Sequence, residues 1–172
     1  QADAEAYVKI AITPHHEPVK VIAIRGYYKK TMGNATTNDR GIYDDAIVLM
    51  GPNYFKTFNG NTDPRQYKQG IALLLPGWHE FQKGIHHPGK PGAHEAFRTA
   101  NPREVLPVLR DGQTGIKEGV TINLHKGGVN STNSAGCQTV PPEQWLEFQK
   151  AAYKMMSDEG QKILPYLLLE NL

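Results

Sequence analysis

Short apolar and β-branched segments recur along most of this chain, and glycine, proline, asparagine and aspartate separate them. Segments this short, bounded by turn-forming residues, are typical of β-strands rather than helices. The turn GPN at 51–53 joins two such segments closely enough for a hairpin, and RDGQTGIKEG at 110–119 makes a longer connection of the same kind. We therefore expect a mainly β fold, a sandwich or barrel-like arrangement. The predicted strands are residues 7–12, 19–28, 45–51, 54–60, 70–77, 80–86, 104–112 and 119–127.

One clear helix is expected near the C-terminus, at PPEQWLEFQKAAYKMM (141–156). It begins with proline and carries a glutamate in its first turn, both of which are typical of helix N-termini. Trp145, Phe148, Ala152 and Met155 recur every three to four residues, so they share one face of the helix. We expect this apolar face to pack against the β-sheet.

Two further segments carry structural expectations. KILPYLLLENL (162–172) is expected to form a terminal strand, and Pro165 within it indicates a position at the edge of a sheet, because proline has no backbone N–H to donate. Residues 86–107 are rich in proline, glycine and histidine. They are expected to form a long loop containing at most one short helix, and long loops within compact domains are often functional.

Length and composition exclude several classes of protein. A chain of 172 residues suits a single domain over 1–172, with 39% hydrophobic and 21% charged residues. A net charge of +2 without a Lys/Arg run does not indicate a nucleic-acid partner, and the apolar runs are too short to span a membrane. A single cysteine excludes an intrachain disulfide and cysteine-based zinc sites. The segment QADAEAYVKI has no basic region followed by an apolar one, so no signal peptide is visible.

The cysteine lies in the stretch that carries most of the chemical information. The predicted strand GVTINLH ends at His125, the flexible segment KGGVNSTNSAG follows, and Cys137 comes next, shortly before the helix. An imidazole beside a thiol can take its proton, and the resulting thiolate is a strong nucleophile. Backbone N–H groups between Ser134 and Cys137 would then stabilise the oxyanion of an attacked amide. A lone cysteine is more commonly a small buried hydrophobe, which is the alternative interpretation of Cys137.

HKGG at 125–128 together with SAGC at 134–137 resembles the signature of L,D-transpeptidase-like (YkuD-type) catalytic domains, in which a histidine followed by glycine precedes an S/T-x-G-C cysteine. LLLPGWHEF at 73–81 is similar to a P-x-G-x-[FY] strand segment of the same family. GIYDDAIVLM and FNGNTDP are similar to phage and prophage lysis-associated proteins. The chain departs from the family at Ala135, where a histidine is common, and at Thr139, where arginine or asparagine is common.

This resemblance implies an L,D-transpeptidase-like fold and an enzyme that acts on peptidoglycan stem peptides through a thioester acyl-enzyme. Cys137 would be the nucleophile, His125 the base and later the acid, and Ser134 and Gly136 would shape the oxyanion site. The missing arginine and the similarity to lysis proteins favour hydrolysis, as carboxypeptidase or endopeptidase, over transpeptidation. No cofactor is implied. A periplasmic or cell-wall location follows, with delivery by a phage or a secretion system as one route. The oligomeric state is left open.

Histidines outside the motif invite a second hypothesis, because imidazole is a common zinc ligand. There is no H-E-x-x-H motif, so exposed loop histidines are the simpler interpretation. His86 or His87 is nevertheless a candidate cleft residue that would supply the second imidazole lacking at Ala135. The six histidines outside the motif are His15, His16, His79, His86, His87 and His94.

Two charged clusters complete the candidates. Asp63 and Arg65, in GNTDPRQY, are candidate cleft residues for the charged groups of a stem peptide, or else part of a solvated turn. Asp44 and Asp45 are adjacent and would face opposite ways on a strand, so a charged strand end is favoured over a glycosidase pair. A metal-dependent hydrolase and a non-catalytic cell-wall-binding module remain the alternatives to a cysteine enzyme.

Overall fold

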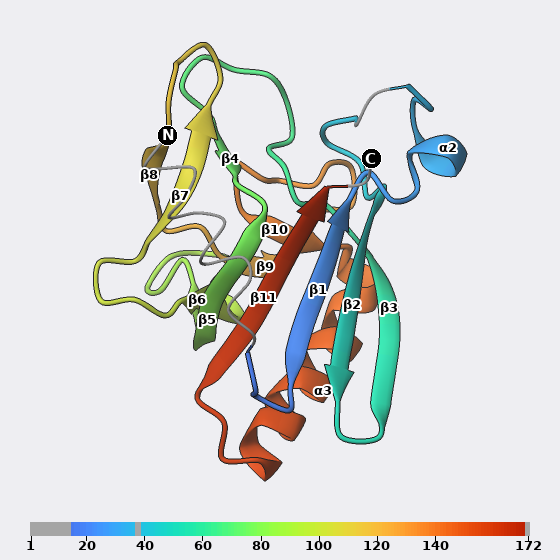
Figure 1. Cartoon of the computed structure of the whole chain (residues 1–172), viewed down its shortest axis with the longest axis vertical. Helices are drawn as coiled ribbons and strands as arrows, with labels where there is room; N and C mark the ends of the chain where they lie inside the picture. Colours follow the sequence, from blue (N-terminus) through green and yellow to red (C-terminus); the bar gives the residue numbers. More distant parts are fainter. Residues whose placement is uncertain (1–14, 37–38, 171–172) are drawn as a thin grey trace.

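The computed structural model describes residues 15–36 and 39–170, and 42% of these described residues are in strands and 14% in helices. The mainly β fold and the helix near the C-terminus are therefore confirmed (Figure 1). The described elements are β1 (Lys20–Arg25), α2 (Lys29–Met32), β2 (Asp45–Gly51), β3 (Tyr54–Gly60), β4 (Ala72–Leu74), β5 (Gly77–His86), β6 (His94–Thr99), β7 (Val105–Arg110), β8 (Lys117–Val120), β9 (Leu124–Lys126), β10 (Gln138–Val140), α3 (Pro142–Asp158) and β11 (Ile163–Glu170).

Within the described part of the chain, eight strands form one strongly curved sheet in the order β10-β9-β6-β5-β11-β1-β2-β3. The two ends of this sheet meet where Asn61, just after β3, pairs with Thr139 of β10 through N–O hydrogen bonds of 2.8 and 2.9 Å. The sheet is thus a nearly closed barrel. A second sheet, in the order β4-β7-β8, lies beside it (Figure 1). This closure brings β9 and β10, which flank the cysteine loop, into parallel register.

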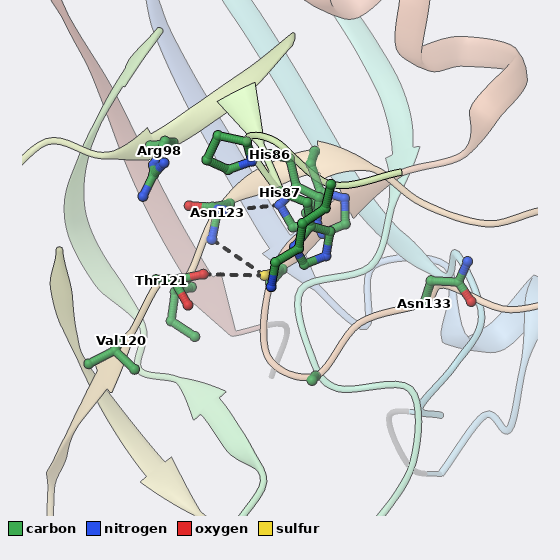
Figure 2. A pocket seen from close by; sticks show the side chains of 13 residues that line it. His86, His87, Arg98, Val120, Thr121, Asn123 and Asn133 are labelled. Carbon is green, nitrogen blue, oxygen red and sulfur yellow. Dashed lines mark hydrogen bonds between the residues drawn. The ribbon is translucent and has the colours of Figure 1, made fainter. Parts of the chain in front are cut away.

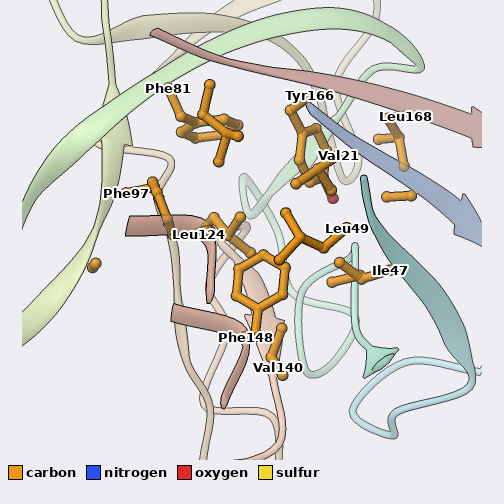
Figure 3. Close-up of a cluster of buried hydrophobic side chains, with 14 of the residues drawn as sticks. Val21, Ile47, Leu49, Phe81, Phe97, Leu124, Val140, Phe148, Tyr166 and Leu168 are labelled. Carbon is orange, nitrogen blue, oxygen red and sulfur yellow. The ribbon is translucent and has the colours of Figure 1, made fainter. Parts of the chain in front are cut away.

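Helix α3 packs against the large sheet, as its apolar stripe predicts, and its Phe148 lies among the buried side chains of the strands (Figure 3). Trp145, Phe148 and Ala152 are all buried, and Phe148 makes an edge-to-face contact with Phe58 at a centroid distance of 5.3 Å. Phe97 of β6 meets the same ring at 6.1 Å. Edge-to-face pairs of this kind each contribute about 0.5–1.5 kcal/mol beyond burial. Through Phe148 the helix therefore packs against both β3 and β6.

The hairpin predicted at residues 51–53 is confirmed. Strands β2 and β3 have the predicted bounds and pair in antiparallel register from Asp45↔Gly60 to Gly51↔Tyr54. Asn53 has φ = 56°, which asparagine tolerates better than most residues with a side chain. The longer connection between β7 and β8 also joins an antiparallel pair, as expected. The predicted strand at 7–12 lies outside the described residues.

Three sequence expectations are wrong. The expected long loop at 86–107 is interrupted by a strand, because β6 forms there and pairs with β5 from Phe81↔Thr99 to His86↔His94. The single strand expected at 119–127 is divided into β8 and β9, because Thr121 has φ = 54°, which a regular strand cannot accommodate. Strand β11 is interior, between β1 and β5. Pro165 is opposite Glu80 of β5. It has no N–H to donate, but it is tolerated because the register with β1 begins only at the next residue, Tyr166.

Candidate active site

Polar side chains gather on one face of β5, β6 and β9. In the β5–β6 register His86 is opposite His94, and in the β6–β9 register Phe97 is opposite Leu124. Because residues two apart on a strand point to the same face, these registers place five polar side chains on one face and leave Phe97 and Leu124 on the core face. The five are His86, His94, Arg98, Asn123 and His125.

A cavity of about 560 Å³ opens on this polar face. Its walls come from the β5–β6 hairpin with Arg98, from the segment joining β8 to β9, and from the loop before β10 (Figure 2). No aspartate or glutamate is among the lining residues, so every formally charged group on its wall is cationic. The lining residues are His86, His87, Pro88, Lys90, Arg98, Val120, Thr121, Ile122, Asn123, His125, Asn133, Ala135 and Cys137.

Cys137 and His125 both lie on the wall of this cavity. The parallel pairing of β9 with β10 places Thr139 beside His125, so Cys137, two residues earlier, comes next to Asn123. The Cys137 thiol donates toward the Thr121 carbonyl oxygen at 3.6 Å and accepts from the Asn123 backbone N–H at 3.5 Å. Burial raises the pKa of the Cys137 thiol to about 11, against the opposing effect of the Asn123 N–H. Cys137 is therefore a protonated thiol at neutral pH.

His125 is held in the tautomer that a base requires. Its Nδ1 lies 2.7 Å from the Lys126 carbonyl oxygen. Because a carbonyl only accepts hydrogen bonds, Nδ1 carries the proton and Nε2 keeps its lone pair. Burial, and next the neighbouring His86, lower the pKa of His125 to about 3. The ring is therefore neutral at physiological pH.

A second imidazole is stacked on the His125 ring. The rings of His86 and His125 have centroids 3.7 Å apart and planes inclined by 12°. The Asn123 side-chain amide donates to His86 Nδ1 at 3.0 Å, so the other ring nitrogen of His86 carries the proton (Figure 2). Burial, and next His87, lower the pKa of His86 to about 4. Two neutral rings can stack closely, whereas two cationic rings would repel each other.

The loop before Cys137 is shaped by Ser134 and Gly136. The Ser134 hydroxyl accepts from the Gly136 N–H at 3.0 Å and donates to the Cys137 carbonyl oxygen at 2.7 Å. Gly136 has φ = 126°, and a Cβ there would lie 2.8 Å from the Ala72 carbonyl oxygen. Both residues lie outside the cavity lining and set the backbone path of Cys137. Among the described residues, the Cys137 N–H has no hydrogen-bond acceptor, so it is the backbone donor left for an oxyanion.

Backbone strain is concentrated around the cavity. Among the described residues, five with side chains have positive φ, and three of these line the cavity, namely His87, Thr121 and Asn133. Positive φ is most unfavourable at Thr121, which is β-branched and whose carbonyl contacts the thiol. Each such residue costs on the order of 1–3 kcal/mol, and strain of this kind clusters at functional sites.

The other candidate residues lie elsewhere. Asp63 is buried and Arg65 is exposed, and neither lines the cavity. The Arg65 backbone N–H donates to the Ser134 carbonyl oxygen at 2.9 Å, so this segment supports the cysteine loop through its backbone. Asp44 and Asp45, which were expected to form a charged strand end, are instead both about 1% exposed.

The remaining histidines have separate environments. His79 is buried and its Nε2 lies 2.8 Å from the Leu75 carbonyl oxygen, while His15 packs against Trp78 at a centroid distance of 4.8 Å. His94 belongs to the cluster around His86, at a centroid distance of 5.4 Å. In the described part of the chain, no group of three or more His, Cys, Asp or Glu side chains is arranged to hold a metal ion.

Comparisons with known proteins add no assignment. No protein-family model matches the chain, and searches of curated proteins and of solved structures find no significant match. Among the described residues, no helix combines the length and the apolar character needed to cross a bilayer.

Sequence reasoning did not single out Lys90, Arg98 or Asn123, which carry the polar chemistry of the remaining cavity wall. Asn123 could have been predicted, because it lies two residues before His125 and the side chains of such residues point to the same face of an extended segment. Arg98 had none, because residues 86–107 were expected to form a loop without a fixed side-chain direction.

Proposed function

We propose that this protein is a cysteine-dependent peptidoglycan-active enzyme that cleaves stem peptides through a thioester acyl-enzyme. The observation that supports the chemistry best is that Cys137 and His125 line the same cavity, with the His125 tautomer fixed by the Lys126 carbonyl. Peptidoglycan as the substrate rests on the resemblance of HKGG and SAGC to L,D-transpeptidase-like domains.

The proposed reaction starts from a thiol and a neutral imidazole. His125 Nε2 takes the thiol proton while Cys137 Sγ attacks the carbonyl carbon of the stem peptide, because the two pKa values oppose a preformed ion pair. The C–S bond forms, and the Cys137 N–H donates to the developing oxyanion. Collapse breaks the C–N bond, and the imidazolium returns its proton to the leaving amine. An acyl group remains on sulfur as a thioester.

Release of the acyl group decides between hydrolase and transferase. When water attacks the thioester, a C–O bond replaces the C–S bond, the product is a carboxylate, and the thiol is restored. When an amine attacks, the product is a new amide and the outcome is transpeptidation. We propose hydrolysis as the main outcome because Thr139 occupies the position where arginine or asparagine is common in the family.

The test is incubation of purified muropeptides with wild-type protein and with Cys137→Ala, followed by mass spectrometry. The wild-type protein is expected to shorten stem peptides and to incorporate heavy oxygen from labelled water, and Cys137→Ala is expected to do neither. A covalent adduct on the intact wild-type protein after brief mixing would identify the thioester. The melting temperature of both proteins serves as the folding control.

Three outcomes would contradict the proposal. Cleavage that persists in folded Cys137→Ala excludes a cysteine nucleophile. Binding to cell-wall sacculi without any product, in both proteins, supports a non-catalytic wall-binding module instead. Cleavage that is abolished by a chelator and restored by a divalent metal would favour a metal-dependent hydrolase.

A further inference from the structure

The cavity beside Cys137 has a one-sided charge distribution. Lys90 and Arg98 contribute cations, and no carboxylate is among the lining residues. The nearby imidazoles of His86 and His125 are neutral, so they do not compete for an anion through charge. The charge of Arg98 is partly balanced by its ion pair with Glu104, but that carboxylate is not among the lining residues, so the groups that face the cavity favour an anion.

Arg98 is held in place by contacts that suit a binding residue. Its Nη2 donates to the Glu104 carboxylate. Its aliphatic stem lies across Gly84 of β5, where an added Cβ would come within 2.9 Å of both Cγ and Cδ of Arg98. Glu104 has φ = 50°, so the ion pair is maintained despite an unfavourable backbone conformation. The guanidinium is therefore fixed before any ligand arrives.

Most of the donor capacity of this guanidinium is unused. A guanidinium carries five N–H groups, and among the described residues only Nη2 of Arg98 has an acceptor. Its Nε is buried without a hydrogen-bond partner. The neighbouring Asn123 Oδ1, also on the cavity wall, is likewise buried and unpartnered. Buried polar atoms without partners are rare in native proteins, and an unmade bond of a charged donor is costly.

A carboxylate in the cavity would take up part of this unused donor capacity, because 25% of the Arg98 side chain is exposed. A carboxylate supplies acceptors to a guanidinium in the bidentate manner that arginine favours. A substrate residue with a free carboxylate is therefore the ligand that suits this wall. In a stem peptide this carboxylate is either the C-terminal one or one that a side chain carries, and its contact with the guanidinium is the same.

We propose that Arg98 is a specificity-determining residue that binds a free carboxylate of the substrate beside the carbonyl attacked by Cys137, with Lys90 contributing charge. The inference rests on the proposed function for its substrate class. It goes beyond that function because it predicts discrimination between a carboxylate and its neutral amide. Such discrimination is a property of binding and is measurable without turnover.

Binding is measured by calorimetry on Cys137→Ala with three synthetic stem peptides. One has all its carboxylates free, one is amidated at the C-terminus, and one is amidated at its side-chain carboxylates. The free peptide is expected to bind about 10- to 100-fold more tightly than one of the amidated peptides, the range for a charge-assisted hydrogen-bonded pair. Whichever amide weakens binding identifies the source of the carboxylate.

Arg98→Gln in the same background is expected to abolish this preference, so that the free and amidated peptides bind equally. Arg98→Lys should restore part of it, because charge returns without the bidentate geometry. Arg103→Gln is the matched control, since Arg103 is exposed, pairs with Glu118, and does not line the cavity. Melting temperatures verify that each variant is folded.

Equal binding of all three peptides to a protein that retains Arg98 would overturn the inference, and so would a carboxylate preference that survives Arg98→Gln. Neither result bears on the nucleophile, because wild-type cleavage that is lost in Cys137→Ala would still support the proposed function. Conversely, a carboxylate preference in a protein that never cleaves would support Arg98 as a binding residue and refute the enzyme.

Discussion

The imidazole rings of His86 and His125 are stacked face to face, with centroids 3.7 Å apart and planes 12° apart. One ring is fixed by the Asn123 amide and the other by the Lys126 carbonyl. The stack therefore shields one face of His125 from water and orients it toward the cavity that also contains Cys137. The lowered pKa values of His86 and His125 keep both rings neutral, so the stack persists across the physiological pH range.

His86→Ala is expected to raise the pKa of His125 from about 3 toward its ordinary value of 6.5. Burial is the main cause of the lowered pKa and the neighbouring His86 is the next, and this change weakens both. The measurement is an NMR titration of the His125 ring in both proteins. His16→Ala, which removes a histidine outside the cavity lining, is the control. An unchanged His125 titration in His86→Ala would mean that deep burial alone sets the pKa.

The parts of this fold that sequence predicts well are those that local residues specify. The β2–β3 hairpin follows from two apolar segments around a turn in which Asn53 accepts positive φ. The stripe on α3 follows from helical periodicity. Strand β6 was missed because its pairing partners, β5 and β9, determine its conformation more than its own residues do.

In the candidate site too, some residues could be predicted from local sequence and others depend on tertiary structure. Cys137 and His125 were recognised from a local pattern of residue types. His86 lies far from both in sequence, and its contact with His125 depends on the order of three strands. The kink at Thr121 could not be predicted, because a β-branched residue with positive φ contradicts its own local preference and is imposed by tertiary structure.

The Cys137 thiol is expected to be alkylated slowly. Cys137 is the chain's single cysteine, so mass spectrometry follows its reaction with iodoacetamide without ambiguity. Because burial raises the thiol pKa to about 11, the thiolate fraction is small at pH 7 and grows as the pH rises. The rate is expected to increase continuously from pH 7 to 10 and to stay below that of a free cysteine peptide. A rate that levels off below pH 8.5 would instead indicate an activated thiolate and would contradict the raised pKa.

Gly136→Ala is expected to destabilise the fold by on the order of 2–4 kcal/mol, combining backbone strain with overpacking. Its φ of 126° disfavours any side chain, and the new Cβ would meet the Ala72 carbonyl oxygen at 2.8 Å, which cannot move without disturbing β4. Gly89→Ala is the matched control, because Gly89 also has positive φ (74°) but no atom within 4 Å of an added Cβ. Urea denaturation measures both. Equal losses in the two variants would show that the contact with Ala72 has no energetic consequence.

Asp44→Asn is expected to stabilise the protein at alkaline pH but not at acidic pH. Burial, and next the adjacent Asp45, raise the pKa of Asp44 to about 7, and its Oδ2 is buried without a hydrogen-bond partner. A carboxyl group with a raised folded pKa stabilises the fold below its ordinary value of 3.8, and that contribution is lost as the pH rises through about 7. Asparagine stays neutral, so the difference in unfolding free energy between variant and wild type should shift in favour of the variant between pH 5 and 8. The shift should reach on the order of 1–3 kcal/mol, the cost of a poorly satisfied buried polar group.

Asp158→Asn, at an exposed ion pair with Lys154, is the control and should show no such trend. A pH-independent difference for Asp44→Asn would place the pKa of Asp44 below this range and contradict the prediction.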